Sequence, residues 1–123
     1  MRYVVIALGG ALGALARYIV AAWIHTRVPA GFPWGTFAVN VSGCLVMGFV
    51  MTLLSERLIV NPQWRYLIPI GFLGAYTTFS TFAFEAFQAN VEGAWLVGGA
   101  YVMASVVAGY AALWLGVVTA RLL

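Results

Sequence analysis

Four long apolar runs, separated only by short polar breaks, constrain this chain more than any other feature of its sequence. The runs cover approximately residues 3–24, 33–54, 65–88 and 94–120. A helix needs about 20 mostly apolar residues to cross the hydrocarbon core of a bilayer, and each run is long enough. The sequence therefore predicts an all-α membrane protein with four transmembrane helices in a single transmembrane domain, residues 1–123.

Composition excludes a water-soluble globule, because only 7% of the residues are charged and 64% are hydrophobic. Soluble domains carry roughly 25% charged residues. The first run is not a signal peptide, since Arg17 interrupts it and it continues to Trp23, beyond the ~7–15-residue core of such signals. The single Cys44 excludes an intrachain disulfide. A net charge of +3 is too sparse for binding nucleic acid.

The number of spans and the arginines predict orientation and assembly. An even number of spans places both termini on one side of the membrane, and that side carries Arg2, Arg57, Arg65 and Arg121. The positive-inside rule favours this side as the cytoplasmic one. Four helices enclose little volume, so a protein-lined path for a polar solute predicts an oligomer. A GxxxG spacing at 9–13 and the pair Ser105 and Gly109 are weak signals for helix association.

Two polar residues stand inside the first two runs, where lipid disfavours them. Arg17 lies within the first run, where its charge would be inside the membrane. The alternative interpretation is that its side chain extends so that the guanidinium reaches the nearby interface. Asn40 shares one helix face with Thr36 and Gly43, since the three are spaced at helical intervals. Its amide can donate two hydrogen bonds to an anion. The alternative is a hydrogen bond that joins two helices.

The third run contains the strongest irregularity, at residues 71–82. Five hydroxyl side chains follow two glycines and Pro69, where an ordinary spanning helix would be rich in leucine. This pattern predicts a break in the third helix near the middle of the span. Unwound backbone at membrane depth is tolerated only inside protein or along a cavity, where its carbonyls can coordinate a cation. A regular helix with its hydroxyls bonded to its own carbonyls is the alternative.

Phe79 and Phe82 stand three residues apart after these hydroxyls, and Glu85 follows three residues later. A phenylalanine ring has a partially positive edge, so two edges could line a narrow anion path without a fixed charge. Taken alone, such a pair is more often packing. In the last run, Tyr101 and Ser105 place two more hydroxyls on one face. No nucleophile and base pair, metal-ligand cluster or phosphate loop is present, so an enzyme is not predicted.

These residues resemble the signature stretches of the CrcB/Fluc fluoride channels in their order and spacing. The three matching stretches are Gly9-Gly10-Ala11-Leu12-Gly13-Ala14-Leu15-Ala16-Arg17-Tyr18, Gly35-Thr36-Phe37-Ala38-Val39-Asn40 and Gly71-Phe72-Leu73-Gly74-Ala75-Tyr76-Thr77-Thr78-Phe79-Ser80-Thr81-Phe82. The resemblance implies a multi-pass protein of the bacterial inner membrane that assembles as an antiparallel, dual-topology homodimer with two pores. It also implies passive export of toxic fluoride and a structural sodium ion, not transported, on the two-fold axis.

The resemblance further implies a role for individual residues. The backbone carbonyls of Gly74 and Thr77 would hold the sodium ion. Asn40, with the rings of Phe79 and Phe82, would contact fluoride. A polar track would contain Thr36, Thr81, Tyr101 and Ser105, with Glu85 at one mouth and Arg17 in the vestibule.

Two departures and two rival functions accompany the resemblance. Some relatives have a serine where this chain has Gly109, and the arginine bias is larger than a strictly dual topology suggests. A four-helix multidrug exporter would need a membrane-embedded carboxylate, typically in the first helix, which has none. A non-transporting assembly subunit would leave the hydroxyl-rich stretch unexplained.

Overall fold

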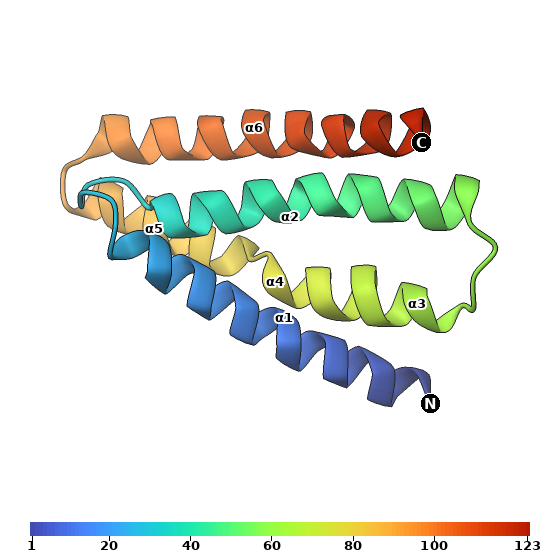
Figure 1. Ribbon diagram of the computed structural model, residues 1–123. Coiled ribbons are helices and arrows are strands. Elements are labelled where there is room, and N and C mark those ends of the chain that lie inside the picture. Colours follow the sequence, from blue (N-terminus) through green and yellow to red (C-terminus); the bar gives the residue numbers. More distant parts are fainter.

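The computed structural model describes all 123 residues, and its secondary structure is entirely helical (Figure 1). The α-helices are α1 (Arg2–His25), α2 (Trp34–Thr52), α3 (Gln63–Arg65), α4 (Gly74–Tyr76), α5 (Phe79–Val91) and α6 (Trp95–Leu122). Two π-helical segments are inserted among them, η1 (Leu53–Arg57) after α2 and η2 (Tyr66–Leu73) between α3 and α4.

Four helical segments are long and apolar enough to cross a membrane, which confirms the predicted all-α class and the four spans. They are Arg2–His25, Trp34–Arg57, Gln63–Val91 and Trp95–Leu122. The second and third segments each end three residues after the predicted limits of 54 and 88. Both termini lie at the end of the molecule that also holds the connection between α2 and α3 (Figure 1).

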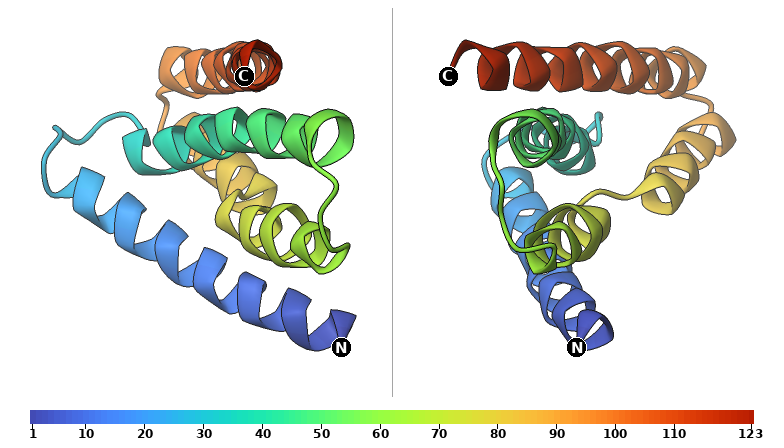
Figure 2. Two further views of the ribbon diagram at one scale, coloured as in Figure 1. Left: turned by 45° about the vertical axis from the view of Figure 1, so that its right-hand side comes forward. Right: turned by 90° about the vertical axis from the view of Figure 1, so that its right-hand side faces the viewer.

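The third span is not one continuous helix. Thr77 (φ −81°, ψ 157°) and Thr78 (φ −148°, ψ 122°) are extended, and they separate α4 from α5. Figure 2 shows this link as a stretch of non-helical chain between the two halves of the segment. Pro69, inside the π-helical segment η2, lacks an N–H and so cannot contribute a regular helical hydrogen bond.

Helices α2 and α6 lie side by side in all views (Figures 1 and 2). Glycines bring their backbones together. A Cβ at position 48 would overlap the Leu113 carbonyl, and one at position 116 would overlap the Leu45 carbonyl. Small residues allow this approach, and packing contacts of this kind stabilise helix pairs in lipid.

The GxxxG spacing at 9–13 is used inside the chain. Gly9 and Gly13 are buried and pack against the backbone of η2, at Leu67 and Phe72. The two glycines therefore bring α1 against the third span of the same chain, and the sequence signal for association between chains is reassigned to this contact.

Replacing Gly13 by alanine is expected to destabilise the fold, because the new Cβ would overlap the Phe72 carbonyl oxygen. Overpacking of this kind costs about 1–3 kcal/mol. Gly10→Ala is the matched control, since a Cβ there would lie 3.9 Å from its nearest neighbour, the Gly71 carbonyl oxygen. Thermal unfolding in detergent should show a lower midpoint for Gly13→Ala only, and equal midpoints for the two variants would contradict this packing.

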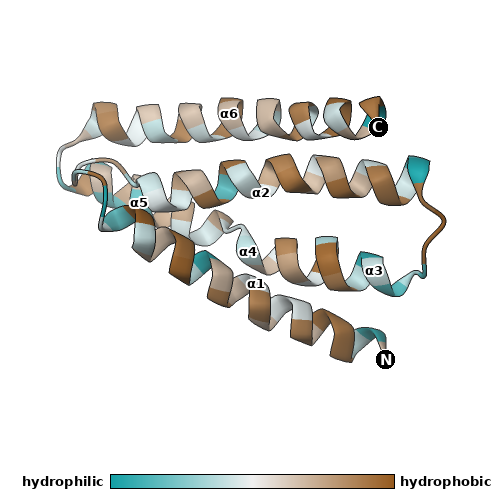
Figure 3. Ribbon diagram, viewed as in Figure 1, coloured by the Kyte–Doolittle hydropathy of each residue, from teal (hydrophilic) through white to brown (hydrophobic).

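Little of the chain is buried, and apolar side chains cover its outside. Only 18 of the 123 residues are buried, and large exposed hydrophobic side chains occur on every spanning helix. Hydrophilic residues gather near the helix ends on both sides of the molecule, with isolated hydrophilic positions inside the spans (Figure 3). This distribution fits a protein whose solvent is lipid.

Candidate functional site

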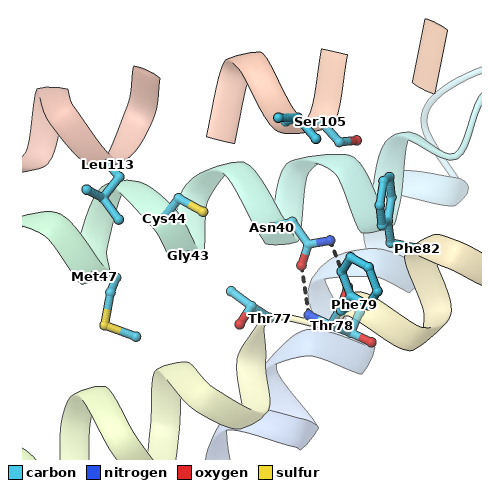
Figure 4. Close-up of a pocket in the computed structure, with 11 residues that line it drawn as sticks. Asn40, Gly43, Cys44, Met47, Thr77, Thr78, Phe79, Phe82, Ser105 and Leu113 are labelled. Atoms are coloured by element: carbon cyan, nitrogen blue, oxygen red, sulfur yellow. Dashed lines mark hydrogen bonds between the residues drawn. The ribbon is translucent and has the colours of Figure 1, made fainter. Parts of the chain in front are cut away.

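An open groove lies between α2, α6 and the extended link (Figure 4). Its lining residues are Asn40, Gly43, Cys44, Met47, Thr77, Thr78, Phe79, Phe82, Ser105, Val106 and Leu113. The lining therefore offers an amide, hydroxyls and aromatic rings, but no charged side chain. Such a surface can contact an anion without holding it by a full opposite charge.

Asn40 forms two hydrogen bonds with the backbone of Thr78 (Figure 4). Its Nδ2 donates to the Thr78 carbonyl at 3.0 Å, and the Thr78 N–H donates to its Oδ1 at 2.8 Å. A primary amide presents one donor and one acceptor side by side, as a peptide group does, so Asn40 pairs with the extended residue as a neighbouring strand would. One Nδ2 proton is still free for another acceptor in the groove.

The two phenylalanines at the groove differ strongly in exposure. Phe79 is 79% exposed, whereas Phe82 is 9% exposed and packs edge-on against Tyr101, with ring centroids 5.1 Å apart. The Phe79 and Phe82 centroids are 5.7 Å apart at an interplanar angle of 57°. The tilted arrangement leaves ring edges available at the groove, and the Phe79 ring has almost no cover from its own chain.

Ser105 contributes a hydroxyl with no partner. Its Oγ is buried and makes no hydrogen bond, although it lines the groove beside Phe82 and Asn40. A buried hydroxyl without a partner is costly, so its presence needs a reason. An anion or a water molecule in the groove would accept its proton.

A second recess lies on the other side of the extended link and is more polar. It is lined by Ala14, Arg17, Tyr18, Ala21, His25, Thr36, Val39, Thr78, Thr81 and Glu85. Thr78 lines both the groove and this recess. The two hollows therefore adjoin the same extended residue.

Glu85 is held by two hydroxyls from other helices. Thr36 Oγ1 donates to its Oε1 at 2.7 Å, and the Tyr101 hydroxyl donates to its Oε2 at 2.9 Å. Arg17 makes no ion pair with Glu85, since the one salt bridge of the chain joins Arg121 to Glu56. The Arg17 guanidinium therefore contributes an unpaired positive charge to the recess, although its helix lies within a membrane span.

The backbone at the end of α4 could hold a cation. A helix end leaves its last carbonyls without intrahelical partners and carries a partial negative charge. Gly74 and Thr77, the residues proposed from sequence as sodium ligands, belong to this turn, and Gly74 is exposed on the surface of the chain. Hard cations prefer oxygen ligands, so carbonyls of this kind fit a cation such as sodium.

The structure divides the residues that sequence suggested for the fluoride path between the two hollows. Asn40, Phe79, Phe82 and Ser105 line the groove, whereas Arg17, Thr36, Thr81 and Glu85 line the recess. Tyr101 is buried between them, bonded to Glu85 and packed on Phe82. His25, the last residue of α1, is exposed and also lines the recess.

Thr78 is the site residue that sequence reasoning did not single out. It was one of five clustered hydroxyls, and only its shared place in both hollows and its bonds to Asn40 distinguish it. At Gly109, where some relatives have a serine, a Cβ would lie 3.5 Å from Cys44 Sγ, which is an ordinary contact. Gly109 lines neither the groove nor the recess.

Comparison with known proteins gives consistent matches over nearly the whole chain. A family model described as CrcB-like protein, Camphor Resistance (CrcB), matches residues 4–117. A fluoride-specific ion channel FluC of Solibacter usitatus is 53% identical over 121 residues, covering 98% of this chain and 99% of that protein. Proteins of the same name from Acidobacterium capsulatum and Nitratidesulfovibrio vulgaris are 49% and 45% identical, covering 96% and 98% of this chain and 94% and 98% of those proteins.

Proposed function

Because this chain belongs to the CrcB family, whose matched relatives are named fluoride-specific ion channels, we propose that it is a fluoride channel that exports the ion passively. The family is one of ion channels, not of enzymes. By this proposal fluoride moves down its electrochemical gradient through the protein and leaves the cell, which relieves its toxicity.

The hydrogen-bond donors that line the groove are the observation that supports a fluoride path. Fluoride is small and strongly hydrated, so a path must replace its water with several close donors. The groove supplies the free Nδ2 proton of Asn40, the unpartnered hydroxyl of Ser105 and the ring edges of Phe79 and Phe82. The recess on the other side of Thr78 supplies the Arg17 guanidinium and the Thr81 hydroxyl, with the Glu85 carboxylate held by Thr36 and Tyr101.

Exposure of the site supports the homodimer. The groove is open, Phe79 is 79% exposed, and the turn at Gly74 lies on the surface. Polar side chains and unwound backbone do not face lipid at membrane depth. A second, antiparallel copy covering this face would enclose two equivalent paths, one along each groove, with the link between α4 and α5 at the middle of the membrane.

The proposed structural sodium ion would lie between the two copies, held by the carbonyls of Gly74 and Thr77 from each. When bound, it would place a fixed positive charge near both paths and lower the cost of an anion inside the membrane. The chain's own contribution would be the end of α4, where the last carbonyls lack helical partners.

Removing sodium is expected to weaken the dimer, because the carbonyls facing one another across the axis would repel without the ion. Protein purified in sodium chloride should elute as a dimer on size exclusion, and protein purified in N-methylglucamine chloride at equal ionic strength should shift toward the monomer. An equal dimer fraction in both salts would contradict the sodium site.

The location and the rival functions follow from the same features. The four spans make the chain a multi-pass membrane protein, and we place it in the bacterial inner membrane, in both orientations. A proton-coupled drug exporter would need a carboxylate in α1, which has none, and Glu85 is already bonded to Thr36 and Tyr101. Efflux of fluoride from proteoliposomes tests the proposal and separates it from drug uptake and from a protein that transports nothing.

A further inference from the structure

Each carbonyl of an α-helix accepts a hydrogen bond from the N–H four residues later. For Gly74 that donor is the N–H of Thr78, and for Thr77 it is the N–H of Thr81. The last regular bond before the break is the one from the Thr77 N–H to the Leu73 carbonyl, at 3.1 Å. Beyond it, both donors are directed to side chains.

The side chain of Asn40 accepts a hydrogen bond from the first of these donors, the Thr78 N–H. The Thr78 N–H donates to Asn40 Oδ1 at 2.8 Å, and the carbonyl of Thr78 accepts from Asn40 Nδ2 at 3.0 Å. Both bonds hold Thr78 in its extended conformation, at φ −148° and ψ 122°. The Gly74 carbonyl is thereby left without its helical donor.

The side chain of Thr78 accepts a hydrogen bond from the second donor, the Thr81 N–H. Its Oγ1 accepts the N–H of Thr81 at 3.3 Å and so caps α5. A ψ of 157° at Thr77 turns its carbonyl out of the helical direction, so this carbonyl also lacks a helical donor, and the cap stabilises the arrangement because it satisfies the Thr81 N–H. The two carbonyls without helical donors are the same two that the proposed sodium site requires.

We infer that Asn40 and the Thr78 hydroxyl are positioning residues for the cation, each diverting one N–H so that a carbonyl is free to bind it. Asn40 thus connects the anion path with the sodium site, since one side of its amide holds the break and its remaining N–H faces the groove. This inference rests on the proposed sodium site. It adds a role for Asn40 that contact with fluoride alone does not require.

The test titrates the dimer of the full chain with sodium chloride, using N-methylglucamine chloride to keep the ionic strength constant, and reads the dimer fraction by size exclusion. Thr78→Val and Asn40→Leu remove the acceptors at nearly constant volume, whereas Thr78→Ser and Asn40→Asp keep them. Thr119→Val is the matched control, because Thr119 is exposed on α6 and its hydroxyl only donates to the Leu115 carbonyl.

The expected result is that Thr78→Val and Asn40→Leu need at least about tenfold more sodium for half-maximal dimer, a change of the size produced by losing one hydrogen bond. Thr78→Ser and Thr119→Val should titrate like the unaltered chain, whereas Asn40→Asp, which keeps the acceptor but loses the donor to the Thr78 carbonyl, should titrate between the unaltered chain and Asn40→Leu. Circular dichroism checks that each variant is folded, and Asn40→Asp supplies a second readout, since it should lose fluoride flux but still need less sodium than Asn40→Leu.

Three results would overturn the inference. One is that Thr78→Val and Asn40→Leu both need the same sodium concentration as the unaltered chain for half-maximal dimer. This result would not contradict the sodium site itself. Another is an equal shift for Thr78→Ser and Thr78→Val, since the hydroxyl would then be irrelevant. A dimer of the unaltered chain that ignores sodium would remove the sodium site and this role together, whereas fluoride efflux from the same preparation would report separately on the channel.

Discussion

Asn40→Asp is expected to abolish fluoride flux while leaving the protein folded and dimeric. The carboxylate keeps an acceptor for the Thr78 N–H, so the break should stay in place. It loses the donor to the Thr78 carbonyl, at a cost of about 1 kcal/mol. A negative charge about 4 Å from the ion, at an effective dielectric constant of about 20, opposes fluoride by roughly 4 kcal/mol.

This repulsion corresponds to a loss of about three orders of magnitude in the occupancy of the path. The measurement is initial fluoride efflux from proteoliposomes, divided by the amount of folded dimer. Asn61→Asp is the matched control, because Asn61 lies in the loop between η1 and α3 and uses only its Oδ1 to accept from the Gln63 N–H. Native flux through folded Asn40→Asp protein would show that Asn40 does not line the path.

Phe79→Ile should lower fluoride flux far more than it lowers stability. The ring is 79% exposed and has little cover from its own chain, so the substitution removes few packing contacts within the monomer. If the ring edge contacts the ion, losing it should reduce flux by about tenfold or more, equivalent to roughly 1.4 kcal/mol. Phe79 is the cleaner test of the two rings, since Phe82 also packs against Tyr101.

Phe82→Ile is expected to lose flux as well, but with a measurable loss of stability of up to about 1.5 kcal/mol from the core contact with Tyr101. Phe84→Ile is the matched control on the same helix, since Phe84 is 60% exposed and lies outside the groove. Equal flux per folded dimer in all three variants would show that Phe79 and Phe82 only pack and do not contact the ion.

The sequence predicted the spans well because membrane insertion depends on local, additive properties. An apolar run of about 20 residues has few stable alternatives to a spanning helix, whatever its neighbours are. The polar positions were visible for the same reason, since Asn40 and the hydroxyls near Thr78 contradict their apolar surroundings. Their types and spacing marked them as sites of interest before any contact was known.

The partners of these residues could not be read from the sequence. Asn40 and Thr78 are 38 positions apart, and Thr36 and Glu85 are 49 apart, so their bonds depend on how α2 packs against the third span. Spacing also could not show that Gly9 and Gly13 contact the third span of their own chain. A GxxxG pattern marks a close backbone contact but does not identify the partner.

Fluoride efflux from proteoliposomes, with chloride measured in parallel, shows whether the chain is a fluoride-selective channel. The purified full chain would be reconstituted in liposomes loaded with potassium fluoride or potassium chloride, and efflux would be started with a potassium ionophore and followed with an ion-selective electrode. We expect rapid fluoride efflux, and chloride efflux no faster than from protein-free liposomes. Fluoride efflux at the protein-free rate, or equal efflux of both ions, would contradict this function.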